Sequence, residues 1–579
     1  MRLLILLFVL AQSIPPAQAP PPVPPAPPAT MAQAQARIAA NDLDGAATIL
    51  EGVISRNPTA FRPINLLGTV RRQQKNFDAA IALFEKSMAV NSTPVNSTPA
   101  YNIGAIYALK GDPDKAFEWL HKAKATGYVD LSFAAIDPDV ASLRTDARFA
   151  GLLPSAEIFK QPFVEDVKIV REFAGEGTND QFGWIARNIG DVDGDKVADF
   201  VTSAPSYARG ANRSVTPGRI YVYSSKSGKL LWTADGAGND SFGIGIEAAG
   251  DTNRDGIPDV IASAPGGGYA KVYSGRDGKV LLTLKAENAS EGFGRHVSGA
   301  GDANGDGYAD VIVGAPGTNA AGNGAGRAYV YSGRDGAVLL TLTGERAGDA
   351  FGSAVAGGAA GKGFLLVVGA PSAGPRSTGR AYVYDTLTAK PKFVVDSDET
   401  GAALGAMFLA LPGDVDGDGV NDVFASDWAN SAKGPSTGRV YVHSGTDGSR
   451  LHAWTGENAG DGFGTTQSVA GDVDGDGSAD LVVGAWQYGG GAPGGGRVYL
   501  YSGKDGRLLK TFTCKTPFDT FGFDAVTLGD VDGDGTSDFL ITSAWSAIRG
   551  YHSGRVFIVS SGVKRASPSR DRSSQAPGR

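Results

Sequence analysis

Cysteine, histidine and long apolar runs are scarce in this chain of 579 residues. Cys514 is the only cysteine, which excludes an internal disulfide. We expect its side chain to be a small buried residue. The five histidines, at positions 121, 296, 443, 452 and 552, have no metal-ligand spacing. No G-x-S-x-G motif marks a hydrolase nucleophile. After residue 19, no apolar run is long enough to cross a bilayer.

Basic patches interleaved with aromatic residues are also missing, which argues against nucleic acid as a partner. The formal net charge is −8, but 22 aspartates lie in six short turns described below. Six bound divalent cations would bring the total to about +4, since each contributes two positive charges. Most of the negative charge therefore belongs to those turns rather than to the surface as a whole.

The two ends of the chain differ in composition from its middle. Residues 1–19, MRLLILLFVLAQSIPPAQA, have an early arginine, a short apolar core and a small-residue end, as a secretory signal peptide does. Residues 20–30 form a proline-rich linker, and residues 563–579 a basic tail expected to be disordered. We therefore predict an exported protein, secreted, periplasmic or on the cell surface. The single cysteine favours bacterial export over an animal ectodomain.

A segment of about 17 residues recurs through the second part of the chain. The copy at Ala470 reads AGDVDGDGSADLVVGAW, and related copies begin at Asp191, Asp251, Asp302, Asp414 and Asp530. The intervals are 60, 51, 112, 58 and 58 residues, and a copy without aspartates, beginning at Phe351, fills the long gap. The chain therefore contains seven repeat units.

Each unit is predicted to form four short antiparallel strands. Phe-Gly pairs open six units, and Asp-Gly turns at Asp277, Asp335, Asp447 and Asp505 join the last two segments. This pattern is typical of a propeller blade, and it predicts seven blades between residues 164 and 562. The region begins on a fourth-strand sequence and ends on a third-strand sequence, so residues 166–174 are expected to complete the last blade and close the ring.

The acidic turns place oxygen ligands at alternate positions, with glycine usually at position six. Such loops suit a hard cation such as calcium. The bidentate glutamate that an EF-hand has at position twelve is missing in all six copies, which excludes that motif, whereas position nine is always aspartate. Side chains at positions one, three, five and nine, with the carbonyl of position seven, could enclose one ion in each turn.

The order FG, D-x-D-x-D-G-x-x-D and GAP resembles the FG-GAP repeats of the integrin alpha-chain propeller and its bacterial relatives. The resemblance implies a seven-bladed propeller with about six calcium ions. The sequence departs from this repeat pattern in two places: Lys196 occupies position six of the first copy, and the fourth copy has no ligands. A D-x-S-x-S motif, which would indicate an inserted adhesion domain, is not found. The candidate metal ligands are Asp191, Asp193, Asp195, Val197, Asp199, Asp251, Asn253, Asp255, Ile257, Asp259, Asp302, Asn304, Asp306, Tyr308, Asp310, Asp414, Asp416, Asp418, Val420, Asp422, Asp472, Asp474, Asp476, Ser478, Asp480, Asp530, Asp532, Asp534, Thr536 and Asp538.

A helical segment with a different period precedes the propeller. Around Gly68 and Gly104 the sequence has the small and packing residues of a 34-residue tetratricopeptide repeat, in two copies 36 residues apart and a weaker third. We predict tetratricopeptide-like helical repeats with a cap over residues 31–153. The alternative is an unrelated helical bundle. Such repeats usually bind peptides or other proteins.

The sequence favours a binding or scaffold protein of the cell envelope over an enzyme. The loops after each second strand lie opposite the acidic turns and carry aromatic residues and arginines, which suit a protein or glycan partner. The candidate partner-binding residues are Tyr207, Arg209, Trp428, Trp486, Tyr488, Trp545, Arg549 and Tyr551. Packing of the three tryptophans between blades is the alternative for those positions. The alternative is a secreted enzyme, such as a glycan hydrolase, a lyase or a quinoprotein-like dehydrogenase. Unpaired carboxylates or a histidine in the central channel would favour this alternative.

Overall fold

The computed structural model describes residues 30–93, 96–209, 215–286, 288, 291–399 and 403–565. The expected signal peptide, the linker up to residue 29 and the tail beyond residue 565 lie outside these residues. The chain divides into two compact units after Thr126. Among the helices of the described ranges, none combines the length and apolarity that a bilayer crossing needs.

The first unit consists of three helix pairs. Their packing depends on glycines, because a Cβ at Gly68 would lie 2.7 Å from the Phe84 ring and one at Gly104 2.8 Å from Leu120. These are the contacts expected of tetratricopeptide repeats, which confirms the helical repeats. The helices are α1 (Met31–Ala39), α2 (Leu43–Arg56), α3 (Phe61–Gln73), α4 (Phe77–Val90), α5 (Thr98–Leu109) and α6 (Pro113–Thr126).

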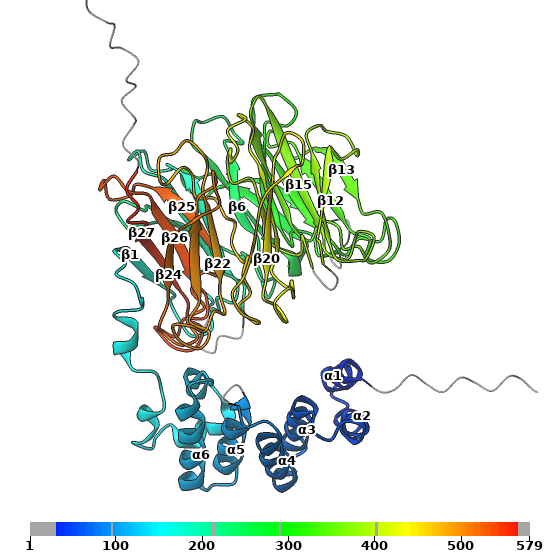
Figure 1. Ribbon diagram of the computed structural model, residues 1–579, viewed down its shortest axis with the longest axis vertical. Helices are drawn as coiled ribbons and strands as arrows, with labels where there is room; N and C mark the ends of the chain where they lie inside the picture. The colour runs from blue at the N-terminus through cyan, green and yellow to red at the C-terminus, as the bar shows by residue number, and fades with distance from the viewer. Residues whose placement is uncertain are drawn as a thin grey trace, which may run out of the picture. The chain divides into compact units, whose positions relative to one another are not determined.

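The second unit contains seven antiparallel sheets, which confirm the predicted seven-bladed propeller (Figure 1). Blades 1 to 3 comprise β2 (Ala186–Gly190), β3 (Asp199–Ala204), β4 (Arg219–Tyr223), β5 (Leu230–Asp235), β6 (Ile246–Gly250), β7 (Asp259–Ala264), β8 (Tyr269–Tyr273), β9 (Val280–Lys285), β10 (Val297–Gly301), β11 (Asp310–Ala315), β12 (Arg327–Tyr331) and β13 (Val338–Thr343). Blades 4 to 7 comprise β14 (Val355–Ala360), β15 (Gly363–Ala370), β16 (Arg380–Tyr384), β17 (Phe393–Asp396), β18 (Leu409–Ala410), β19 (Val423–Asp427), β20 (Arg439–His443), β21 (Arg450–Thr455), β22 (Leu481–Ala485), β23 (Arg497–Tyr501), β24 (Leu508–Thr513), β25 (Ala525–Gly529), β26 (Asp538–Ser543), β27 (Arg555–Ser560) and β1 (Ile169–Ala174).

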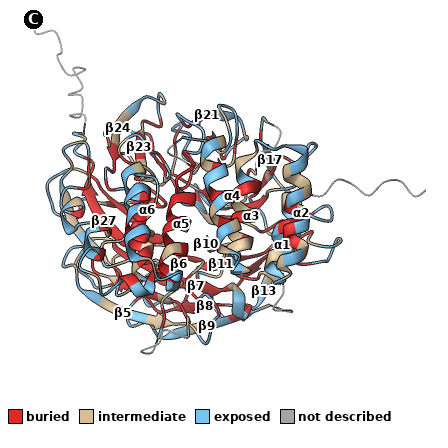
Figure 2. Cartoon of the chain, turned by 90° about the horizontal axis from the view of Figure 1, so that it is seen from below, coloured by how far each residue is buried: buried red, intermediate tan, exposed pale blue. Residues whose placement is uncertain are grey.

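The Phe-Gly pairs hold neighbouring strands together at the start of each unit. Their phenylalanines are at most 1 % exposed, for example Phe242 and Phe351. The glycine after Phe351 has a φ of +88°, and a Cβ there would lie 2.1 Å from the carbonyl oxygen of Arg327. A side chain is therefore excluded at Gly352 by both conformation and space. Second strands such as β7 are buried throughout, whereas the outer strands β5, β9 and β13 carry exposed residues (Figure 2).

The ring closes as the sequence predicts. β1, from the start of the propeller region, pairs antiparallel with β27 at its end, with Phe173 opposite Val556 (Figure 1). Glu172 of β1 also pairs with the buried Arg555 of β27 at 2.9 Å. The expected completion of the seventh blade by residues 166–174 is thereby confirmed.

The sixth blade departs from the four-strand pattern, since its sheet has only β22, β23 and β24 among the described residues. Its inner segment makes two isolated bridges, Phe463 with Ala485 and Gly471 with Asp480. Gly471 belongs to the acidic turn, so the turn is still attached to the blade. The outer edge of this blade is covered by the chain before β1, where the amide of Val164 donates to the Thr513 carbonyl at 2.9 Å.

Four short 3-10 turns lie between α6 and β1, namely η2 (Leu131–Ala135), η3 (Pro138–Leu143), η4 (Phe149–Gly151) and η5 (Ala156–Phe159). The sequence analysis placed most of this stretch with the helical repeats as a cap. In the structure it contacts the seventh blade instead: the Phe133 ring lies 5.2 Å from that of Tyr551, and the Phe159 carbonyl accepts from Arg555.

Candidate functional site

The acidic hairpins fold around the carboxylate at position one. In the fifth blade, Asp414 Oδ1 accepts the amides of Gly417 (2.6 Å) and Asp418 (3.1 Å), and its Oδ2 accepts that of Gly419 (2.8 Å). The first hairpin repeats this arrangement around Asp191. An aspartate at position one therefore shapes the turn even without an ion, because its short side chain reaches the amides of the following residues.

Position six requires a left-handed backbone. Gly419 has a φ of +86°, and Lys196 has a φ of +69° at the same position of the first hairpin. A side chain in this region costs about 1–2 kcal/mol relative to glycine. The first hairpin therefore contains local strain at position six, and the second contains the same kind of strain at position four, where Arg254 has a φ of +60°.

Replacing Lys196 with glycine is expected to stabilise the propeller by about 0.5–1 kcal/mol, since relief of strain outweighs the added entropy of the unfolded chain. The matched variant Gly419→Lys is expected to destabilise by about 1 kcal/mol, because no described atom lies within 4 Å of a Cβ built there and the cost is conformational alone. Chemical denaturation of both variants measures the two changes. If Lys196→Gly is less stable than the wild-type protein, the lysine makes stabilising contacts that outweigh its backbone strain.

Position nine anchors each hairpin to its blade. Asp422 is fully buried; its Oδ2 accepts the Val415 amide at 2.7 Å, and its Oδ1 accepts the Gly445 amide at 2.9 Å. Burial raises the pKa of this carboxyl to about 6, as it does for Asp199, Asp480 and Asp538. For Asp259 and Asp310 the pKa is raised by the same cause. A nearby cation would favour the ionised form of all six.

Four hairpins bring the carboxylates of positions one, three and nine together, with one oxygen of each within 4.8 Å of the others. In the second and third hairpins position three is an asparagine, which offers an amide oxygen. Position five is not among these clustered carboxylates; its Oδ1 accepts the amide of position seven, as Asp418 does from Val420. The four clusters are Asp191, Asp193 and Asp199; Asp414, Asp416 and Asp422; Asp472, Asp474 and Asp480; and Asp530, Asp532 and Asp538.

The donor set of these clusters fits a hard divalent cation, because every side-chain ligand is an oxygen. Two buried carboxylate oxygens, Asp474 Oδ1 and Asp538 Oδ1, have no hydrogen-bond partner among the described residues, which is costly unless a cation is nearby. Basic side chains partly offset the charge: Lys168 Nζ lies 2.7 Å from both Asp532 and Asp534. The fourth blade has a tight turn at Gly361 between β14 and β15, and no acidic hairpin.

The loops opposite the acidic hairpins hold the candidate partner-binding residues in different environments. Tyr488 is 7 % exposed and lies beneath Arg497, whose guanidinium carbon is 3.9 Å from the ring centre. Tyr207 lies in the same way beneath Arg219, at 4.0 Å. Each tyrosine therefore packs against an arginine of its own blade and against the core shared with the preceding blade. Arg209 and Arg549 are exposed; Arg209 pairs with Asp235, and Arg549 donates to the Gly175 carbonyl at 3.2 Å.

Three aromatic candidates of blades 6 and 7, Trp486, Trp545 and Tyr551, form one cluster with His552. Trp486 and Trp545 meet edge to face at 5.0 Å, and Trp545 stacks on His552 at 5.0 Å. Tyr551 stacks on the other side of this histidine, at 3.7 Å. All three candidates are partly exposed, so the cluster both packs between blades and reaches the surface. Trp428 is not part of it, and its buried Nε1 has no hydrogen-bond partner.

Arginine, carboxylate and tyrosine form triads that the sequence analysis missed. Glu457, from the loop before blade 6, accepts from Arg497 (2.9 Å) and from the Tyr499 hydroxyl (2.7 Å). Glu176 does the same for Arg219 and Tyr221. The signal was the recurring GR-x-Y at the start of third strands, with an acidic residue about 40 positions earlier. Since each acidic residue precedes its blade, the triads tie blades to the loops that enter them.

Charged residues also meet in the central channel. Arg187 of β2 is 1 % exposed; its Nε donates to Glu247 of β6 at 2.8 Å, and its Nη1 donates to Asp524 before β25. Both carboxylates are therefore paired with the same guanidinium. His296 receives the Val355 amide at 3.5 Å, and its pKa is lowered to about 3 by burial.

Comparison with known proteins agrees with this architecture. A model of the FG-GAP repeat matches residues 293–331, a model of the FG-GAP-like repeat matches 414–483, and the tetratricopeptide repeat model matches 31–87 and 65–128.

The chain is also similar to integrin alpha chains. It is 28 % identical to mouse integrin alpha-2 over 229 residues (35 % of this chain, 19 % of the relative). It is 31 % identical to chicken integrin alpha-6 over 156 residues (24 % and 14 %), and 34 % identical to mouse integrin alpha-E over 184 residues (27 % and 15 %). The matched stretches thus span less than a fifth of these relatives. The chain therefore contains FG-GAP repeats similar to those of integrin alpha chains, and its tetratricopeptide repeats precede a seven-bladed β-propeller.

Proposed function

We propose that this protein is an exported, calcium-binding scaffold of the cell envelope, whose propeller binds a protein or glycan partner. The observation that carries the proposal is the convergence of three carboxylates in each of four hairpins. Calcium at about six hairpins would hold one face of the propeller rigid, because each ion neutralises carboxylates that otherwise repel one another. The all-oxygen donor set and the similarity to integrin alpha chains support calcium as the ion.

The opposite face is the proposed binding surface. Its loops carry the exposed Arg209 and Arg549 and the partly exposed cluster of Trp486, Trp545 and Tyr551. Arginine and aromatic side chains are favoured anchors at interfaces, and loops on a rigid scaffold are where binding residues commonly lie. The helical repeats are proposed to bind a peptide or protein of their own. The residues before Thr30, where the signal peptide is expected, lie outside the described structure.

Two sets of alanine variants test the binding face. Replacing Arg209, Arg549 and Trp486 together is expected to lower capture of the partner from the native envelope at least tenfold, because exposed anchors are lost without touching the acidic hairpins. Replacing the exposed Arg334 and Lys279, which lie in turns beside those hairpins, is the matched control and should leave capture unchanged. Equal capture by both sets would contradict the face assignment. Capture that disappears only when residues 30–126 are deleted would assign binding to the helical repeats.

A further inference from the structure

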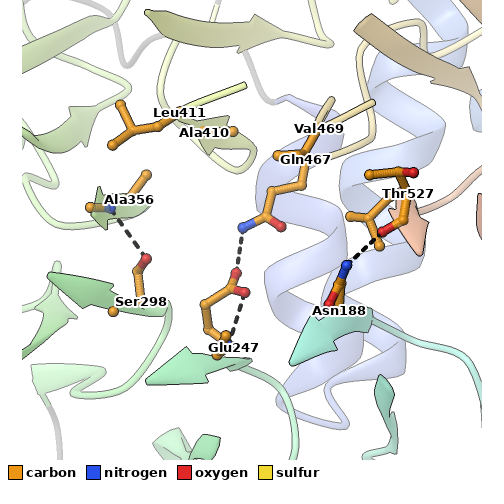
Figure 3. Close-up of a pocket in the computed structure, with 13 residues that line it drawn as sticks. Asn188, Glu247, Ser298, Ala356, Ala410, Leu411, Gln467, Val469 and Thr527 are labelled. Atoms are coloured by element: carbon orange, nitrogen blue, oxygen red, sulfur yellow. Dashed lines mark hydrogen bonds between the residues drawn. The ribbon is translucent and has the colours of Figure 1, made fainter. Parts of the chain in front are cut away.

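The central channel contains a cavity of about 270 Å³, to which the inner segments of all seven blades contribute. One side of the cavity is polar, formed by Asn188, Glu247, Gln467 and Thr527. The other side is formed by small and apolar residues such as Ala356, Ala410 and Leu411. Figure 3 shows Glu247 and Gln467 pointing toward each other across the channel, with Ala356 and Leu411 on the far side. A concave site with an apolar wall and few polar groups is typical of ligand pockets.

The polar wall offers two acceptor atoms, one on Glu247 and one on Gln467. The amide nitrogen of Gln467 and the guanidinium of Arg187 both donate to Glu247 Oε2. Glu247 Oε1 accepts only the Ala248 amide, at 3.0 Å, and a carboxylate oxygen has two acceptor sites. Because the nitrogen of Gln467 is engaged, its Oε1 is left as an acceptor, and no described residue hydrogen-bonds to it. A ligand that complements these atoms must bring donors.

The charges behind the wall do not balance. One guanidinium, Arg187, pairs with two carboxylates, Glu247 and Asp524, and all three residues are less than 9 % exposed. Burial raises the pKa of both carboxyls, and the charge of Arg187 opposes this shift. The adjacent His296 does not supply it, since burial keeps this histidine neutral at pH 7.

The cavity is accessible from the acidic-hairpin side. The inner strands run from the Phe-Gly pairs toward the hairpins, so Asn188, Gly299 and Thr527, which follow the charged layer in their strands, lie nearer that face. All three are partly exposed, whereas Arg187 and Asp524 are buried. Solvent therefore reaches the cavity from the side with the acidic hairpins, where the field of the carboxylates favours cations over anions.

We propose that this cavity binds a small organic ammonium ion, with Glu247 as its counter-ion. The ammonium group donates to Glu247 Oε1 and Gln467 Oε1, and supplies the positive charge that the three buried residues lack. An alkyl body packs against Ala356, Ala410 and Leu411. An ammonium has three donors and no acceptor, which suits the two free acceptors of Glu247 and Gln467. A carboxylate ligand would add negative charge to the pocket, and a neutral alcohol would leave the charge uncompensated. This site does not depend on the proposed partner-binding face.

The probe for this site is n-butylammonium, with n-butanol as its neutral counterpart. Titration of the full-length protein, in saturating calcium and followed by calorimetry, should show n-butylammonium binding with a dissociation constant in the millimolar range or below. We expect n-butanol to bind at least tenfold more weakly. No saturable binding of n-butylammonium, or equal affinity for the two probes, would overturn the proposal.

Three variants locate the binding. Glu247→Gln removes the counter-ion and leaves Arg187 paired with Asp524, and Ala356→Leu fills the apolar side; each should weaken n-butylammonium binding at least tenfold. The control Glu457→Gln changes a glutamate that pairs with Arg497 outside the channel, and should bind normally. If the melting curve shows that Glu247→Gln does not fold, the site is tested by Ala356→Leu and by the comparison of the two probes. Unchanged affinity in a folded Glu247→Gln, or in Ala356→Leu, would contradict the site.

Discussion

Adding millimolar calcium to chelator-treated protein is expected to raise the melting temperature of the propeller by roughly 10 °C or more. At ten times the dissociation constant, each independent site contributes about 1.4 kcal/mol. Six such hairpins would add about 8 kcal/mol, because every ion relieves repulsion between carboxylates that lie within a few ångströms. Differential scanning calorimetry with and without calcium measures this shift.

Single-hairpin variants provide the control for this effect. Asp416→Asn weakens one cluster by replacing the carboxylate at position three, so it should remove no more than about one sixth of the calcium-dependent shift. The equivalent change outside the hairpins, Asp505→Asn, concerns an exposed turn between β23 and β24 and should leave the shift intact. A melting temperature that does not respond to calcium in the wild-type protein would refute the stabilising role.

Removing the strand that closes the ring is expected to cause the second large loss of stability. A chain that begins at Asn179 lacks β1, so β27 loses one of its two ladder partners and Arg555 loses the carboxylate of Glu172. Leaving this buried guanidinium without that partner costs about 3 kcal/mol or more, in addition to the lost packing of Phe173. The exposed edge of β27 should also promote association between chains.

The matched control begins at Gly127, which keeps the whole second unit including β1 and the four 3-10 turns. It should melt at the temperature of the propeller in the full chain and stay monomeric in analytical ultracentrifugation. The shorter chain should melt at least about 10 °C lower and form larger species. Equal stability and a monomeric state for both chains would mean that β1 does not close the ring.

The repeated features of this fold were predictable because each depends on residues close in sequence. Asp-Gly turns, Phe-Gly pairs and acidic hairpins recur at a fixed spacing, and in the structure Asp414 shapes its turn through residues within five positions. Closure of the ring was predictable as well. The residues around Phe173 have the pattern of a fourth strand, and the first blade already has four strands without them.

Contacts between distant blades could not be predicted in this way. Arg187 and Asp524 are 337 residues apart in the chain but meet in the channel, because a ring brings its first and last blades together. The sequence shows an arginine and an aspartate in inner strands, and only the closed ring indicates that they pair. In the same way, the aromatic candidates were identified by residue type, whereas the burial of Tyr488 depends on Arg497, which lies across its loop.

Counting the calcium ions bound per chain tests the central claim most directly. Equilibrium dialysis of the full-length protein against calcium, after removal of bound metal, should give close to six ions, with the Asp191 to Asp199 site weaker than those of blades 5 to 7, whose hairpins have glycine at positions four and six. The variant Lys196→Gly should strengthen binding at this hairpin without adding a further ion. A stoichiometry near zero would show that the acidic hairpins are turns stabilised by their own aspartates and would contradict the proposed calcium scaffold.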